Sequence, residues 1–173
     1  MYVKIIGCIM IVAATTGYGQ LLSRDYQKHM DALQYLKQII QMLRGEIQYT
    51  KVPLQEAFRH IGIRLREPYS TWLKELADGL EWRMGASFLQ LWESSIETHL
   101  IDTKLQLTDL EQLKKLGQNM GYLDEKMQLA TIDLYIQQLE HEIEHTREGL
   151  TTKKRLCRCL GIMSGIFIAV VLI

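Results

Sequence analysis

Acidic residues are confined to the middle of this 173-residue chain, between Asp25 and Glu148. Residues 1–23 and residues 156–173 each carry a single charged side chain, which is basic in both cases. A chain with two apolar ends and a charged middle does not fold as one simple soluble domain, because the apolar ends must leave water. The formal net charge of zero also argues against nucleic acid as a partner, since no basic field attracts it.

Both ends have the length and the apolar character of membrane-spanning helices. Ile5 to Ser23 is an uncharged run of 19 residues, and Cys159 to Ile173 is a second uncharged run. About 20 apolar residues, at about 1.5 Å each, cross a hydrocarbon core about 30 Å thick. We therefore predict transmembrane helices over residues 1–23 and 156–173, with a helical domain over residues 24–155 between them.

Basic residues beside the second span set the predicted orientation. Lys153, Lys154 and Arg155 lie directly before it, and basic residues mark the cytoplasmic side of a span. The central domain is therefore expected in the cytoplasm, with both termini outside. A cleaved signal peptide, with Gly17 and Gly19 before the cut, is the alternative for the first segment. We favour two retained spans, because a secreted central domain would violate the same charge rule.

The central domain has the apolar periodicity of long helices. Apolar residues recur every three or four positions in two stretches, one after the first span and one before the second. The first stretch comprises Tyr26, Met30, Leu33, Leu36, Ile40, Leu43 and Ile47, and the second comprises Leu129, Ile132, Ile136, Leu139, Ile143, Thr146 and Leu150. We expect these two helices to pair antiparallel as a stalk.

Four shorter helices are predicted between the two long ones. Pro53 and Pro68 are expected to begin the first two, and another follows Gly85. The second and third of these helices carry Trp72 and Trp92 on apolar faces, which places both indoles in the core. No stretch alternates with the period of two that a half-buried strand requires. The predicted fold class is therefore all-α, a membrane-anchored bundle of about six helices.

Capping signals mark the ends of the last two helices. Thr108 and Glu111 have the spacing of a capping box, which predicts the start of the fifth helix. Gly121 is expected to end that helix in the left-handed conformation, with a positive φ. Asp124 is expected to cap the amino terminus of the last long helix.

One motif matches a catalytic pattern. His141, Glu142 and His145 form H-E-x-x-H, the spacing by which helical zinc peptidases hold zinc and place a general base. The helix around the motif is acidic and no convincing third ligand follows it. We interpret the motif as a solvated surface, and a membrane-tethered zinc peptidase is the alternative. The chain also lacks the Walker loop and the G-x-S-x-G motif, so no catalytic residue, cofactor or metal is assigned.

A basic patch is the candidate surface for docking a partner. Arg59, His60, Arg64 and Arg66 cluster around the helix that begins at Pro53. Such a cluster can attract an acidic partner surface, and a solvated helix face is the alternative.

Two sequence patterns are shared with a known family. The first is Val52-Pro53-Leu54-Gln55-Glu56-Ala57-Phe58, which follows the first long helix. The second has the form L-G-x-x-[LM]-G-x-x-D-x-x-x-Q and consists of Leu116, Gly117, Met120, Gly121, Asp124 and Gln128. Together with the apolar ends, these patterns resemble the stage III sporulation protein AB family over essentially the whole chain.

The resemblance implies a membrane component of the channel that connects mother cell and forespore in endospore-forming bacteria. The family resembles the helical cytoplasmic domain of platform proteins in type II secretion and type IV pili, and a general platform subunit is the alternative setting. It implies a secretion-type ATPase and other channel components as partners, and a site in the mother-cell membrane facing the forespore. A homo-oligomer is compatible with it. No catalytic residues come with the family, so residues 116–128 are expected to form a structural helix–turn–helix.

Overall fold

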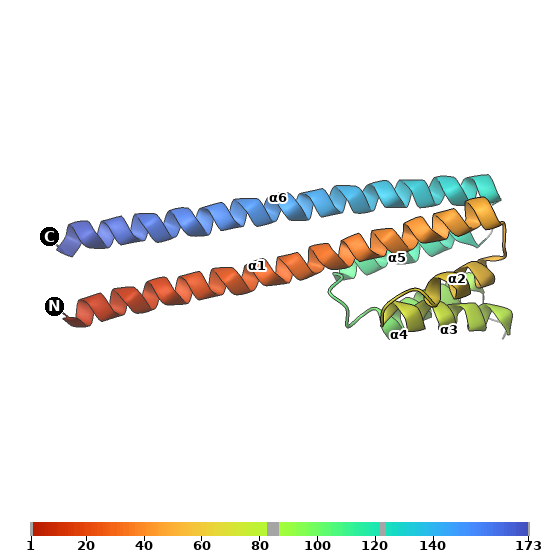
Figure 1. Ribbon diagram of the computed structural model, residues 1–173, viewed down its shortest axis with the longest axis horizontal. Helices are drawn as coiled ribbons and strands as arrows, with labels where there is room; N and C mark the ends of the chain where they lie inside the picture. Colours follow the sequence, from red (N-terminus) through yellow and green to blue (C-terminus); the bar gives the residue numbers. More distant parts are fainter. Residues whose placement is uncertain (1, 83–86, 122–123, 173) are drawn as a thin grey trace. The chain divides into compact units, whose positions relative to one another are not determined.

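The computed structural model describes residues 2–82, 87–121 and 124–172, and it describes side chains within 24–82, 87–118, 120–121 and 124–149. The described residues form helices and no strand, which confirms the all-α class and the expected six α-helices. In chain order the elements are α1 (Tyr2–Gly45), the π-helical turn η1 (Glu46–Thr50), α2 (Leu54–Gly62), α3 (Tyr69–Glu81), α4 (Phe88–His99), α5 (Leu107–Met120) and α6 (Glu125–Leu172) (Figure 1).

The chain divides into two compact units. Unit 1 contains residues 1–30 and 143–173, and unit 2 contains residues 31–142. The predicted spans over 1–23 and 156–173 belong to unit 1, where the backbone is helical and the side chains lie outside the described part. Among the residues that the structure describes, none of the helices combines the length and the apolar character needed to cross a membrane.

Within unit 2, two ion pairs join α1 to α6. Arg44 Nε lies 2.5 Å from Asp133 Oδ1, and Lys37 Nζ lies 3.4 Å from Glu140 Oε1. A step of seven residues backward along α1 corresponds to a step of seven forward along α6. The two helices therefore run antiparallel within this unit, and the continuation of the pair as a stalk stays a prediction.

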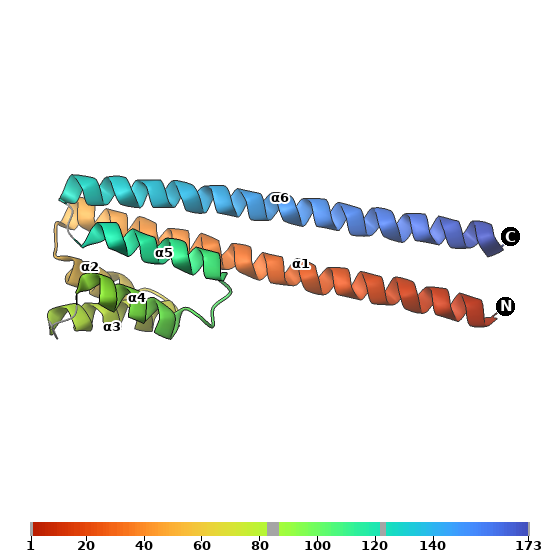
Figure 2. The same ribbon diagram turned by 180° about the vertical axis from the view of Figure 1, so that it is seen from behind.

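The shorter helices of unit 2 pack in chain order. α2 packs on η1 and on α3, α3 packs on α4, and α4 packs on α5. Figure 2 shows α5 between α6 and the group formed by α2, α3 and α4. Pro53 and Pro68 directly precede α2 and α3, as the sequence predicts, while Gly85 lies outside the described residues.

An aromatic cluster forms the centre of this packing. Phe58 of α2, Trp72 of α3 and Trp92 of α4 are fully buried, which confirms the prediction for both tryptophans. The centroid of the Trp92 ring lies 5.4 Å from that of Trp72 and 5.9 Å from that of Phe58. Burying each such side chain contributes about 1.5–3 kcal/mol, so one cluster holds three helices together.

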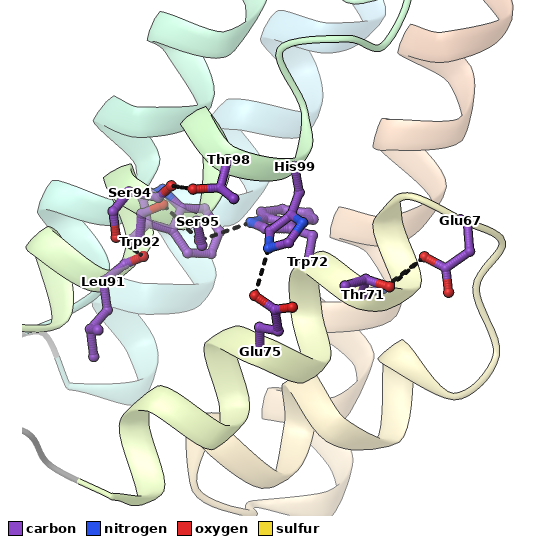
Figure 3. A network of polar contacts seen from close by, with 10 residues as sticks. All are labelled: Glu67, Thr71, Trp72, Glu75, Leu91, Trp92, Ser94, Ser95, Thr98 and His99. Atoms are coloured by element: carbon purple, nitrogen blue, oxygen red, sulfur yellow. Dashed lines mark hydrogen bonds and ion pairs between the residues drawn. The ribbon is translucent and has the colours of Figure 1, made fainter.

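Polar contacts satisfy the groups that this cluster buries (Figure 3). Trp72 Nε1 donates a hydrogen bond to Ser95 Oγ at 3.1 Å. A second contact joins the same helices at the surface, where His99 Nε2 lies 2.8 Å from Glu75 Oε2. The pairing of α3 with α4 therefore rests on both apolar and polar contacts.

The start of α5 corrects one prediction. The helix begins at Leu107, and its N-cap is Gln106, two residues before the expected N-cap Thr108. Asp109 Oδ2 accepts the backbone N–H of Gln106 at 2.7 Å, whereas Thr108 and Glu111 are exposed. The Asp109 side chain is buried, and a buried carboxylate must find donors. This requirement sets the boundary of the helix.

Candidate functional site

The H-E-x-x-H motif lies on α6. His141 and His145 are exposed and Glu142 is half-buried. Two histidines supply two of the four ligands of a tetrahedral zinc ion. Among the described residues there is no group of three or more His, Cys, Asp or Glu side chains arranged to hold a metal ion.

Arg59, the first residue of the basic patch, is bound within its own chain. Its Nη2 lies 2.5 Å from Glu81 Oε2 and 2.9 Å from Asp78 Oδ1, so the side chain joins α2 to α3. The hydrogen bond to Glu81, and to a smaller extent the one to Asp78, raise the pKa of Arg59 above its ordinary value. The charge of this guanidinium is therefore already matched by two carboxylates.

Arg66 and His60 also have partners in unit 2. The Arg66 guanidinium carbon lies 4.0 Å from the centroid of the Tyr35 ring, and the Arg66 backbone N–H donates to Tyr35 Oη at 2.9 Å. His60 Nδ1 lies 3.6 Å from Glu46 Oε2. The structure does not bring the four residues together as one unpaired basic surface.

Arg64 differs from the rest of the patch. Its side chain is exposed, and no ion pair is found for it among the described residues. The preceding residue, Ile63, is a large apolar side chain with 68% of its surface exposed. Of the four residues of the predicted patch, Arg64 is thus the one without a partner among the described residues, and it forms a small exposed surface together with Ile63.

The predicted turn at residues 116–128 starts with a close helix contact. Leu116 and Gly117 are buried, and the indole of Trp92 lies directly on Gly117. A Cβ at Gly117 would lie 2.2 Å from Trp92 Cδ1. Trp92 Nε1 donates to the carbonyl oxygen of Leu113 at 2.9 Å, one turn earlier on α5. Gly117 thus allows α4 to approach α5.

Gly121 corrects a second prediction. Its φ of −72° and ψ of −21° are right-handed, so the expected left-handed cap with a positive φ is wrong. A Cβ at this position would lie 3.2 Å from Phe88 Cδ1, which is tighter than about nine in ten such contacts. The Phe88 ring in turn stacks on Trp92, with centroids 5.9 Å apart. Close packing at the start of α4 accounts for the glycine.

Asp124 and Gln128 satisfy backbone groups at the ends of two helices. Asp124 Oδ1 accepts the N–H of Met127 at 2.9 Å, which is the N-cap that the sequence predicts for α6. Gln128 Nε2 donates to the carbonyl oxygen of Met120 at 3.0 Å, at the end of α5. Asp124 and Gln128 thus define how α5 passes into α6, whereas Gly117 and Gly121 set α5 against α4.

A groove between α5 and α6 did not emerge from the sequence. It encloses about 680 Å³ and is lined by Leu116 and Lys115 on α5 and by Leu134 and Glu142 on α6, among others. The Leu134 side chain is 61% exposed. One signal was present, because Leu134 lies off the predicted apolar stripe of the last helix.

Comparison with known proteins covers the whole chain. The family model described as Stage III sporulation protein AB matches residues 4–173. The chain belongs to this family. It is 27% identical over 169 residues to Stage III sporulation protein AB of Bacillus subtilis (strain 168), and the match covers 98% of each chain. A solved structure of Stage III sporulation protein AB has a TM-score of 0.64 and 26% identity, and the match covers 72% of this chain and 97% of that one.

Family membership confirms the resemblance drawn from residues 52–58 and 116–128 and assigns the chain to sporulation. It favours this setting over a general secretion or pilus platform. The names of the relatives state a stage of sporulation and specify neither a ligand nor a reaction. Candidate partner-binding residues must therefore be identified from the exposed side chains of this chain.

Proposed function

We propose that this family member is a non-enzymatic membrane scaffold of the channel between mother cell and forespore, and that it docks a cytosolic secretion-type ATPase. The observation that carries the proposal is the family match over residues 4–173, which includes both apolar ends. The contacts of the motif at residues 116–128 agree with a structural role, since each of them joins helices or caps one.

Residues 1–23 and 156–173 are the membrane anchors in this proposal. Support comes from their uncharged runs, from the helical backbone over residues 2–23 and 156–172, and from the basic residues before the second span. The ion pairs of α1 and α6 in unit 2 agree with the predicted antiparallel pairing of the two long helices. Unit 2 then faces the cytoplasm of the mother cell.

A topology reporter tests this arrangement. A reporter active only in the cytoplasm should work when inserted after Asp102, an exposed residue between α4 and α5. The same reporter fused after Ile173 should be inactive. An inactive reporter at Asp102 would contradict the cytoplasmic domain and favour the signal peptide.

The surface formed by Ile63 and Arg64 is the proposed contact with the ATPase. An arginine beside an exposed apolar side chain has the composition of an interface hot spot. Arg64 also offers a guanidinium that no described carboxylate neutralises, whereas Arg59 is held by two. An acidic surface on the ATPase would match it.

Capture of the ATPase from sporulating cells tests this contact. Arg64→Glu should reduce the captured ATPase about tenfold, because one hot-spot residue commonly contributes more than about 1.4 kcal/mol. Lys126→Glu is the matched control, since Lys126 is also exposed and forms no ion pair among the described residues. Equal capture by Arg64→Glu and the parent would contradict the docking surface.

The peptidase alternative is tested separately. We expect the double change His141→Ala and His145→Ala to leave sporulation unchanged and to alter stability by no more than about 0.5 kcal/mol, because both side chains are exposed. The non-enzymatic proposal would be refuted if the purified parent contained stoichiometric zinc and if this variant lost both the zinc and sporulation.

A further inference from the structure

The groove between α5 and α6 has a basic side chain, Lys115, toward one end and an acidic side chain, Glu142, toward the other. Gln128 Nε2 donates to the Met120 carbonyl at one end of the groove, and α5 and α6 run antiparallel from there (Figure 2). Further along, burial and then the charge of the Asp109 carboxylate raise the pKa of the Tyr135 hydroxyl, which agrees with this direction. Lys115, which lies between Met120 and Asp109 on α5, is therefore placed near residue 131 of α6.

Glu142 lies at the other end of the groove. The distance from residue 131 to residue 142 along α6 is about 16 Å, at about 1.5 Å per residue. Neither Lys115 nor Glu142 forms an ion pair within the described part of the chain. The groove thus carries an unpaired cation at one end and an unpaired carboxylate at the other.

Apart from His141, which directly precedes Glu142, the lining between these two charges carries neither a basic nor an acidic side chain. It includes the carboxamides of Gln112, Gln137 and Gln138 and the exposed side chain of Leu134. The acidic residues of α6 over the same stretch, Asp133 and Glu140, are paired with α1 instead. Carboxamides both donate and accept hydrogen bonds, so they can pair with a surface identical to their own.

We propose that a second copy of this chain occupies the groove, related to the first by a two-fold axis near Gln137. This axis lies about midway between residues 131 and 142 of α6. Rotation about it places Lys115 of each copy opposite Glu142 of the other, so both unpaired charges are matched twice. It also covers Leu134 of both copies. A self-complementary surface of this kind is what a two-fold interface requires.

Disulfide cross-linking in membranes isolated from sporulating cells, with copper phenanthroline added as the oxidant, tests the position of the axis. The full chain carries Cys8→Ser, Cys157→Ser and Cys159→Ser, and a cysteine is then placed at one site. Gln137→Cys should form a disulfide with Gln137→Cys of the second copy, because a residue near a two-fold axis lies close to the same residue of the other chain. Tyr49→Cys is the control, since this side chain is 78% exposed and lies outside the groove. Equal cross-linking at both sites, or none at Gln137→Cys, overturns the proposal.

Charge exchange tests the two ion pairs. Lys115→Glu alone and Glu142→Lys alone each place like charges together twice, so each should weaken dimerisation of the detergent-solubilised full chain about tenfold. The double variant restores both pairs and should dimerise like the parent. Arg64→Glu, which tests the ATPase contact, should dimerise normally. A monomeric parent at every concentration, or a double variant weaker than both single ones, refutes the dimer.

Discussion

The contact between Gly117 and Trp92 is the tightest in the turn at residues 116–128, and its loss can be predicted in magnitude. In Gly117→Ala the new Cβ would lie 2.2 Å from Cδ1, 2.5 Å from Nε1 and 2.6 Å from Cγ of the Trp92 ring. Carbon atoms in contact prefer about 3.5–4.0 Å. The indole or α5 must therefore move by more than about 1 Å.

That movement affects two stabilising interactions. Trp92 Nε1 would leave the Leu113 carbonyl, and an unpaired buried donor costs about 1–3 kcal/mol. Overpacking against Phe58 and Trp72 costs about 1–3 kcal/mol more. Alanine in a helix recovers about 1 kcal/mol relative to glycine. We therefore expect Gly117→Ala to lower the free energy of unfolding by about 1–5 kcal/mol, the net of these terms.

Thermal unfolding of the detergent-solubilised chain, followed by near-ultraviolet circular dichroism of the tryptophans, measures this loss. Gly45→Ala is the matched control, because Gly45 has a right-handed φ of −63° and nothing lies within 4 Å of its Cβ position. It should stabilise the chain by about 0.5–1 kcal/mol. In a Trp92→Phe background, Gly117→Ala should cost at least about 1 kcal/mol less. A Gly117→Ala variant as stable as the parent would refute the reasoning.

Three further predictions concern single groups of unit 2. Asp124→Ala should cost about 1 kcal/mol in thermal unfolding, because the N–H of Met127 loses its acceptor, and Asp124→Asn should retain most of the stability. Tyr135→Phe should raise the free energy of unfolding by about 1 kcal/mol, since the Tyr135 hydroxyl is buried without a hydrogen bond in the described part of the chain; a loss would reveal a partner. Hydrogen bonds from the Thr71 hydroxyl and N–H hold the pKa of the Glu67 carboxyl below its ordinary value of 4.5. This contribution is present above pH 4.5 and is lost as the pH falls through the folded-state pKa. The advantage of the parent over Glu67→Gln in unfolding should therefore be largest near pH 7 and should shrink as the pH is lowered below 4.5.

The helices could be predicted because the buried positions of a helix recur every three or four residues, and the apolar residues of a single sequence show this spacing. Leu33, Leu36 and Ile40 of the first stripe are buried, and prolines mark the starts of α2 and α3. The second stripe is less regular. Tyr135 is buried although it lies off the stripe, because α5 covers that side of α6 near Asp109. Periodicity predicts one apolar face and does not show that a helix has neighbours on two sides.

The contacts between helices could not be predicted, because they depend on how one helix is set against the next. From the sequence, Arg59 is predicted to be part of a basic patch, whereas in the structure it forms ion pairs with Asp78 and Glu81 of α3. The sequence around Gly121 predicts a left-handed helix cap, whereas the structure shows a right-handed backbone and the Phe88 ring close to the position of a Cβ. In both cases the deciding partner lies more than 15 positions away in the sequence. In both cases the local sequence singled out a residue that matters in the fold, but it predicted a different role from the one that the structure shows.

The motif that this chain shares with its family and the surfaces that we propose for partners are made of different residues, and there is a physical reason for the separation. Gly117, Asp124 and Gln128 each make a contact inside the fold, and this contact accounts for the residue without a partner. Binding needs groups whose interactions the fold leaves incomplete. Arg64 and Lys115 meet this condition, since each is exposed and without an ion pair among the described residues. A change in the motif should therefore act on both partner surfaces together through stability, whereas a change at Arg64 or at Lys115 should act on one of them.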